Sequence, residues 1–273
     1  MAVVYEGKGG VRIIMNKVNQ STSREVIQFL LFAISINLLL GSCSILERIR
    51  DEGKEQQTNT RDETYSIDSS TLLESLKEGR KDAFILLTAT PPAYPSPSTE
   101  PVCWTQKDFI TINQALYSIG WQDNLSDWKL KDFSFGLKCS EIDYGPQGAG
   151  FNFFKTEQNN DKVVRVLRHL FIAANDNFAI LNETEYYPEI EKWTAINMAS
   201  ISIPVEDALQ IAEINGGMQF RKNVDNNCFI NAEVNTGSDS AVWIISYSGL
   251  TNQRNELFRL TINAKTGEII KNR

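Results

Sequence analysis

The chain has a single histidine, His169, and only four cysteines, none in a C-x-x-C spacing. Nucleophilic catalysis needs a base beside the nucleophile, and metal sites need clustered ligands, so neither is favoured. Basic residues are the minority, 27 against 34 acidic ones, which gives a net charge of −7. Binding to phosphates needs clustered Lys and Arg. We therefore expect no metal, no cofactor, no catalytic residue and no nucleic-acid partner.

Long hydrophobic runs are also scarce, since the chain has one, Val26 to Leu40. Lys17 and Arg24 precede this run, and the small residues Gly41 and Ser42 follow it. A positive region, an apolar stretch of this length and small residues at its end are typical of a secretory signal. An uncleaved membrane anchor or a buried core helix are the alternatives.

The end of this segment, Leu40-Gly41-Ser42-Cys43, resembles the lipobox of bacterial lipoproteins. The resemblance implies cleavage between Ser42 and Cys43, and attachment of a lipid anchor with fatty chains such as palmitate to Cys43. Residues 1–42 would then be a signal peptide, and translation starting at Met15 would give that signal an ordinary length. The body would lie outside the cytoplasm, in the cell envelope, anchored to a membrane by its N-terminal lipid.

Residues 43–101 are expected to be a lipid-anchored polar and proline-rich tether. Glu47 to Ser70 has too few apolar residues to form a core, and Pro91 to Pro101 holds five of the eight prolines. One short amphipathic helix is predicted between them, over Thr71 to Arg80.

The clearest pattern lies near the C-terminus. Pro204 to Ile214 has the periodicity of a short amphipathic helix, followed by Gly216 and Gly217. Ala241 to Ser248 and Glu256 to Asn263 alternate as strands, and Lys265-Thr266-Gly267 predicts a tight turn before an edge strand at Glu268 to Ile270.

This succession of helix, Gly-Gly, W-x-I-x-Y strand and NAKTGEII hairpin resembles the PepSY domain family over about the last 70 residues. The resemblance implies a helix packed on a small antiparallel sheet. It also implies a role in restraining extracytoplasmic proteases, and it brings no catalytic residue.

An internal repeat extends this pattern upstream. Arg168 to Asn182 aligns with Phe258 to Asn272, with Asn177 opposite Gly267, and a helix is predicted over Gln106 to Ile119. We therefore predict an α+β fold of two tandem PepSY-like units, 102–195 and 196–273, each a helix packed on an antiparallel sheet. The alternative is one larger α+β sheet without internal symmetry.

The remaining cysteines and the histidine have expected places. Cys103 and Cys139 fall within the first unit and could form a disulfide, which would leave Cys228 as a small buried residue. His169 is expected on a strand surface.

The sequence thus favours a non-enzymatic binding or regulatory module of the cell envelope. Its partner would be an envelope protein or peptide, bound by the sheet through strand addition. The alternative is an envelope enzyme or enzyme accessory that uses acidic residues between the two units, with Glu141, Asp143, Glu189 and Glu191 as candidates. A structural spacer is a third possibility.

Overall fold

The computed structural model describes residues 56–88, 94–98, 100–123, 125–159, 162–187, 193–236, 240–251 and 254–272. All of these belong to one unit, Glu55 to Arg273. The expected signal peptide (residues 1–42), its alternative start at Met15 and the lipidation site Cys43 lie outside the described residues.

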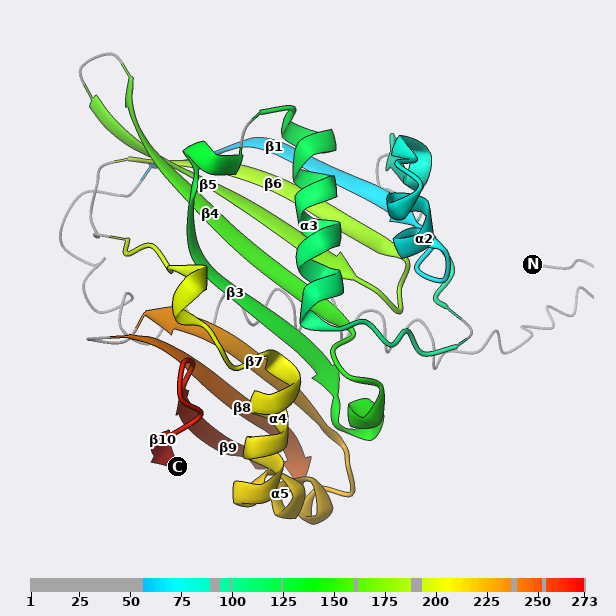
Figure 1. The fold of residues 1–273 in the computed structure, drawn as a ribbon, viewed down its shortest axis with the longest axis vertical. Helices are drawn as coiled ribbons and strands as arrows, with labels where there is room; N and C mark the ends of the chain where they lie inside the picture. Colours follow the sequence, from blue (N-terminus) through cyan, green and yellow to red (C-terminus); the bar gives the residue numbers. More distant parts are fainter. Residues whose placement is uncertain are drawn as a thin grey trace, which may run out of the picture. The chain divides into compact units, whose positions relative to one another are not determined.

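Ten strands form one sheet in the order β10-β9-β8-β7-β3-β4-β5-β6-β1-β2 (Figure 1). Every neighbouring pair is antiparallel. The strands are β1 (Gln56–Ile67), β2 (Phe84–Leu87), β3 (Lys129–Lys138), β4 (Gly148–Asn159), β5 (Lys162–Ala173), β6 (Phe178–Tyr187), β7 (Cys228–Thr236), β8 (Ala241–Thr251), β9 (Arg254–Asn263) and β10 (Ile269–Asn272).

The helices lie on one face of this sheet, which we call the helical face (Figure 1). They are α2 (Leu72–Lys77), α3 (Gln106–Trp121), α4 (Val205–Ala212) and α5 (Met218–Asn223), with short 3₁₀ turns at Lys81–Ala83, Leu125–Asp127, Cys139–Tyr144 and Met198–Ser200. A row of apolar side chains directly opposite one another crosses six strands of this face: Trp243, Val234, Phe133, Phe151, Leu170 and Leu181. All six are buried, so alternation along each strand separates this core from the second face.

Helix α3 confirms the prediction of a helix beginning at Gln106. Thr105 accepts a hydrogen bond from the Asp108 backbone N–H and the Asp108 side chain bonds back to Thr105, which completes a capping box. Phe109, Ile112 and Leu116 face the sheet and are fully buried. The helix ends at Gln122, which takes the left-handed conformation.

The second predicted helix is broken. α4 ends at Ala212, and a π-helical segment, Glu213–Gly217, leads into α5. A Cβ at Gly217 would lie 2.6 Å from the Tyr247 hydroxyl oxygen. Glycine at this position therefore lets the helix approach β8.

The predicted fold class, two tandem helix-on-sheet units, is wrong. β3 pairs with β7 from Phe133 opposite Val234 to Lys138 opposite Phe229, which makes a single sheet. The hydrophobic core is likewise one cluster that contains Phe133 and Trp243 together. The edges of two small sheets would leave backbone groups unpaired, and joining them satisfies those groups.

The tether prediction for residues 43–101 is wrong for residues 56–67 and 84–87, which are strands, whereas the short helix predicted over Thr71 to Arg80 is confirmed as α2. Residues 56–67 form β1, which pairs with β6 on one side and β2 on the other. Tyr65, Ile67 and Phe84 join the core. The physical reason is that a central strand needs few apolar residues of its own when both neighbours supply its backbone partners.

The local turn chemistry was predicted correctly. Asn177 and Gly267 both have positive φ, 57° and 77°. β3 also carries an irregularity, a register shift against β4 between Leu130 and Asp132.

Candidate functional site

The disulfide differs from the predicted one. Cys139 is bonded to Cys228, and Cys103 is a free, exposed thiol. Cys139 follows β3 and Cys228 begins β7, so the antiparallel pairing of these strands brings the two cysteines together. The bond links the end of β3 to the start of β7, next to the β3–β7 pairing that makes the two parts of the sheet continuous.

The acidic residues proposed for an enzyme do not form a cleft among the described residues. Glu141 is half-buried and is engaged by Asn175 Nδ2 at 3.2 Å and by Lys138 at 3.6 Å. Asp143 is exposed on the same 3₁₀ turn. Glu189 and Glu191 lie outside the described residues.

A different polar arrangement crosses the second face of the sheet. Five side chains stand directly opposite one another on consecutive strands β3, β4, β5, β6 and β1, and we call them the polar row: Asp132, Asn152, His169, Asn182 and Asp62. Because directly paired residues of neighbouring strands project to the same side, the row is one continuous strip.

Hydrogen bonds fix the orientation of three members of this row. Asn152 Nδ2 donates to Asp132, so Asn152 Oδ1 is left to face His169 Nδ1 at 2.8 Å. With the amide in this orientation, Nδ1 of a neutral imidazole carries the proton and Nε2 is the acceptor. His169 is half-buried, not the surface residue that the sequence predicted, and burial lowers its pKa.

Glu233 lies on the same face, one strand further along. It sits opposite Ser134 on β3 and is 8% exposed. Burial, together with the nearby Asp132 carboxylate, raises the pKa of Glu233 from its usual 4.5 to about 7. A carboxyl group with this pKa can take up or release a proton near neutrality.

A second buried charge cluster lies on the helical face around Arg168. Its Nε donates to Glu183 at 2.7 Å, and its Nη1 donates to both oxygens of Asp123. The guanidinium carbon lies 3.9 Å from the centre of the Trp128 ring and 4.8 Å from that of Trp121. Its Nε and Nη1 are thus engaged by residues of the fold itself, which indicates a structural role.

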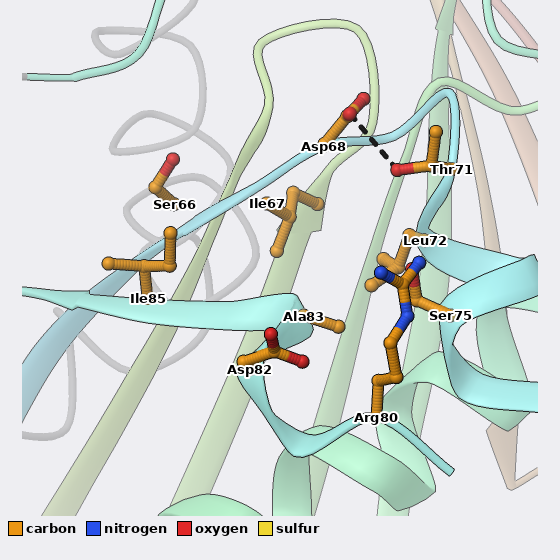
Figure 2. Close-up of a pocket in the computed structure, with 10 residues that line it drawn as sticks. All are labelled: Ser66, Ile67, Asp68, Thr71, Leu72, Ser75, Arg80, Asp82, Ala83 and Ile85. Atoms are coloured by element: carbon orange, nitrogen blue, oxygen red, sulfur yellow. Dashed lines mark hydrogen bonds between the residues drawn. The ribbon is translucent and has the colours of Figure 1, made fainter. Parts of the chain in front are cut away.

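A small pocket of about 210 Å³ lies beneath α2 (Figure 2). Ile67 and Leu72 form part of its apolar wall, and Arg80 and Asp82 contribute opposite charges. Asp68 also lines it, but its carboxylate is occupied by Ser70 and by Thr71 at the start of α2.

Within the part of the chain that the structure describes, no group of three His, Cys, Asp or Glu residues could hold a metal ion. Nor does this part contain a helix long and apolar enough to cross a bilayer.

No family model and no curated protein matches the chain. Among solved structures, the chain is similar to a MaoC-like dehydratase from Phytophthora capsici at 10% identity, over 77% of this chain and 92% of the other, with a TM-score of 0.18. It is also similar to HtdX of Mycobacterium tuberculosis, at 9% identity over 78% and 96% of the two chains, with a TM-score of 0.19. A peroxisomal multifunctional enzyme type 2 from Drosophila melanogaster matches at 12% identity, over 98% and 58%, with a TM-score of 0.19. Likenesses this low establish neither a shared fold nor a function.

Sequence reasoning missed Glu233 and the polar row. Glu233 is a single acid within the apolar and amide-rich run CFINAEVN, and this isolation is the one signal that could have marked it. The row itself depends on the strand register, which the spacing of residues along the chain does not give.

Proposed function

We propose that the chain is a cell-envelope lipoprotein whose folded body acts as a non-enzymatic binding or regulatory module outside the cytoplasm. The observation that carries the extracytoplasmic location is the Cys139–Cys228 disulfide. Disulfides persist in oxidising compartments and are rare where thiols are kept reduced. This agrees with the lipobox-like Leu40 to Cys43 and with its implied acylation of Cys43.

The binding mode we propose is strand addition at the β2 edge of the sheet. β2 ends the strand order, so it pairs with β1 alone among the described strands. Its four residues are apolar, and Ile85 and Leu86 are 62% and 44% exposed. Edge strands are usually protected by charged residues, proline or bulges, and β2 has none of these within its length. An extended segment of an envelope protein or peptide would complete the edge.

The lipid anchor is tested by metabolic labelling with a fatty-acid probe. We expect the wild-type chain to carry the probe and to partition with membranes, and Cys43→Ala to do neither. Labelling that survives in Cys43→Ala, or a mature chain that begins at another residue, contradicts the lipoprotein assignment.

The edge is tested with a disulfide-intact body of residues 55–273, cross-linked in envelope extract. A charge at the edge should block strand addition, so we expect Ile85→Lys to lose a partner that the wild-type body captures. Ile214→Lys is the matched control, because Ile214 is 74% exposed but lies in the π-helical segment, away from the edge. Equal capture by both variants contradicts the proposed edge.

A second candidate, an envelope enzyme that works through acidic residues, is favoured by one observation, the neutral-range pKa of Glu233. Perturbed carboxyl groups are enriched at catalytic sites, although structural networks also produce them. If this candidate holds, Glu233→Gln abolishes the enzymatic turnover of a substrate and leaves the capture of an envelope partner by the β2 edge intact.

A further inference from the structure

We propose that the pocket beneath α2 is a binding site for a small aliphatic zwitterion, of the class of free α-amino acids. The proposal is independent of the lipid anchor, and it shares one residue, Ile85, with the β2 edge. It follows from two opposite charges, Arg80 and Asp82, that line one small pocket together with aliphatic side chains.

The positive side of the pocket is Arg80. Its Nη2 donates to the Ser75 hydroxyl, and its Nε bonds Glu78 at 3.1 Å. Ser75 is 5% exposed, so this hydrogen bond holds the guanidinium against a buried partner. Nη1 has no partner among the described residues, and its two N–H groups can donate to a ligand carboxylate.

The negative side is Asp82, in the 3₁₀ turn before β2. Its carboxylate lies across the pocket from the Arg80 side chain, with Ala83 between them (Figure 2). No ion pair within 4.0 Å joins Asp82 to Arg80, although only one residue separates them. A ligand that carries both charges can therefore bridge the two side chains.

The wall between the charges sets the remaining chemistry of the ligand. Ile67 and Leu72 line the pocket but are only 4% and 1% exposed, so its accessible aliphatic surface comes mainly from Ile85, which is 62% exposed, and from half-buried Ala83. The volume of about 210 Å³ is smaller than the roughly 300–1,000 Å³ of sites for drug-sized ligands. An aliphatic side chain on a compact zwitterion satisfies both limits.

The test compares L-leucine with N-acetyl-leucine, which lacks the ammonium, and leucinamide, which lacks the carboxylate. Binding to the disulfide-intact 55–273 body is followed by calorimetry and by NMR shifts of Ser75 and Ala83. We expect leucine to bind, and each analogue to bind at least about tenfold more weakly, because each loses one charged contact. Equal binding of the three ligands, or no binding of leucine at millimolar concentration, overturns the proposal.

Variants of the pocket test which residue contacts the carboxylate of the ligand and which contacts its ammonium group. Arg80→Gln should lose discrimination against leucinamide, and Asp82→Asn should lose discrimination against N-acetyl-leucine. Glu74→Gln and Lys77→Gln are matched controls, because they remove exposed charges from α2 without lining the pocket. Unchanged affinity and selectivity in Arg80→Gln and Asp82→Asn overturns the assignment. If Arg80→Gln fails to fold, Arg80→Lys and the ligand series on the wild-type chain still decide it.

Discussion

At the residue scale, Glu233 shows how one buried carboxyl group makes the stability of the sheet depend on pH. Its pKa is raised in the folded chain, so the native state holds a proton that the unfolded state releases above about pH 4.5. The cost of charging Glu233 is absent below that pH, grows as the pH rises and is complete above about pH 7. Stability should therefore fall between about pH 4.5 and about pH 7.

Replacing this group with a neutral amide should remove the fall. We expect Glu233→Gln to be more stable than wild type at pH 8, by up to about 3 kcal/mol, and nearly unchanged at pH 4. Urea unfolding at a series of pH values measures the difference in unfolding free energy between the variant and wild type at pH 8 and at pH 4. Glu268→Gln, an exposed carboxyl near the C-terminal turn, is the control, and an unaltered slope in Glu233→Gln contradicts the prediction.

His169 acts in the opposite direction at lower pH. Burial lowers its pKa, so the unfolded chain takes up a proton below about 6.5 before the folded chain does. Stability supplied by the neutral imidazole is thus lost as the pH falls through its folded pKa. We expect His169→Gln to flatten the decline below pH 6.5 in the same unfolding series. A decline as steep as that of wild type would show that other groups cause it.

Arg168 is the residue whose chemistry is least replaceable. Its guanidinium is both hydrogen-bonded to Asp123 and Glu183 and stacked on Trp128. A lysine keeps the charge but has no planar group to stack and fork. We expect Arg168→Lys to cost about 2–3 kcal/mol of unfolding free energy. Denaturant titration with tryptophan fluorescence measures this, and Arg259→Lys, on an exposed β9 position, should cost much less.

At the element scale, α3 and α4 cap each other. The Gln106 side chain accepts a hydrogen bond from Val205 N–H at 2.8 Å, and the Glu206 side chain accepts one from Gln106 N–H at 2.7 Å. Each bond satisfies a first-turn donor that its own helix cannot. The two helix N-termini are thus fastened to each other across 100 residues of sequence.

This reciprocity predicts an energetic coupling. Gln106→Ala and Glu206→Ala should each cost about 1 kcal/mol, the usual value of a helix cap. Because both bonds join the same two helix ends, losing one loosens the other, and the double variant should cost less than the sum. A double-mutant cycle by urea unfolding measures the difference. Strict additivity would show that the two caps act independently.

The elements differ in how far the sequence determines them. α3, β8 and β9 were predicted because their own residues carry cap and alternation signals, such as Thr105 and Trp243. β1 was missed, since its backbone partners, not its side chains, make it a strand. The Cys139–Cys228 bond was missed for a related reason: the pairing of β3 with β7 decides which cysteines meet. Hydrophobic periodicity is local, whereas strand register is not.

At the scale of the whole molecule, the β3–β7 junction joins four C-terminal strands to six others. The disulfide closes 89 residues across it. Cross-linking a segment of that length restricts the unfolded chain, so reduction should cost about 2–4 kcal/mol. We expect Cys139→Ser with Cys228→Ser to lower the urea midpoint accordingly, and Cys103→Ser to leave it unchanged. Equal midpoints for all three proteins contradict this.

The N-terminal limit of the body follows from the same sheet. A chain that begins at Val102 lacks β1, α2 and β2, which leaves the edge of β6 unpaired from Phe178 to Tyr187 and removes the core residues Tyr65 and Leu72. An uncovered edge of this length is a template for pairing with other chains. We expect residues 102–273 to self-associate in size-exclusion chromatography and to melt at a lower temperature than residues 55–273. If residues 102–273 stay monomeric and melt at an unchanged temperature, then β1 is an appendage and the folded body begins only at Val102.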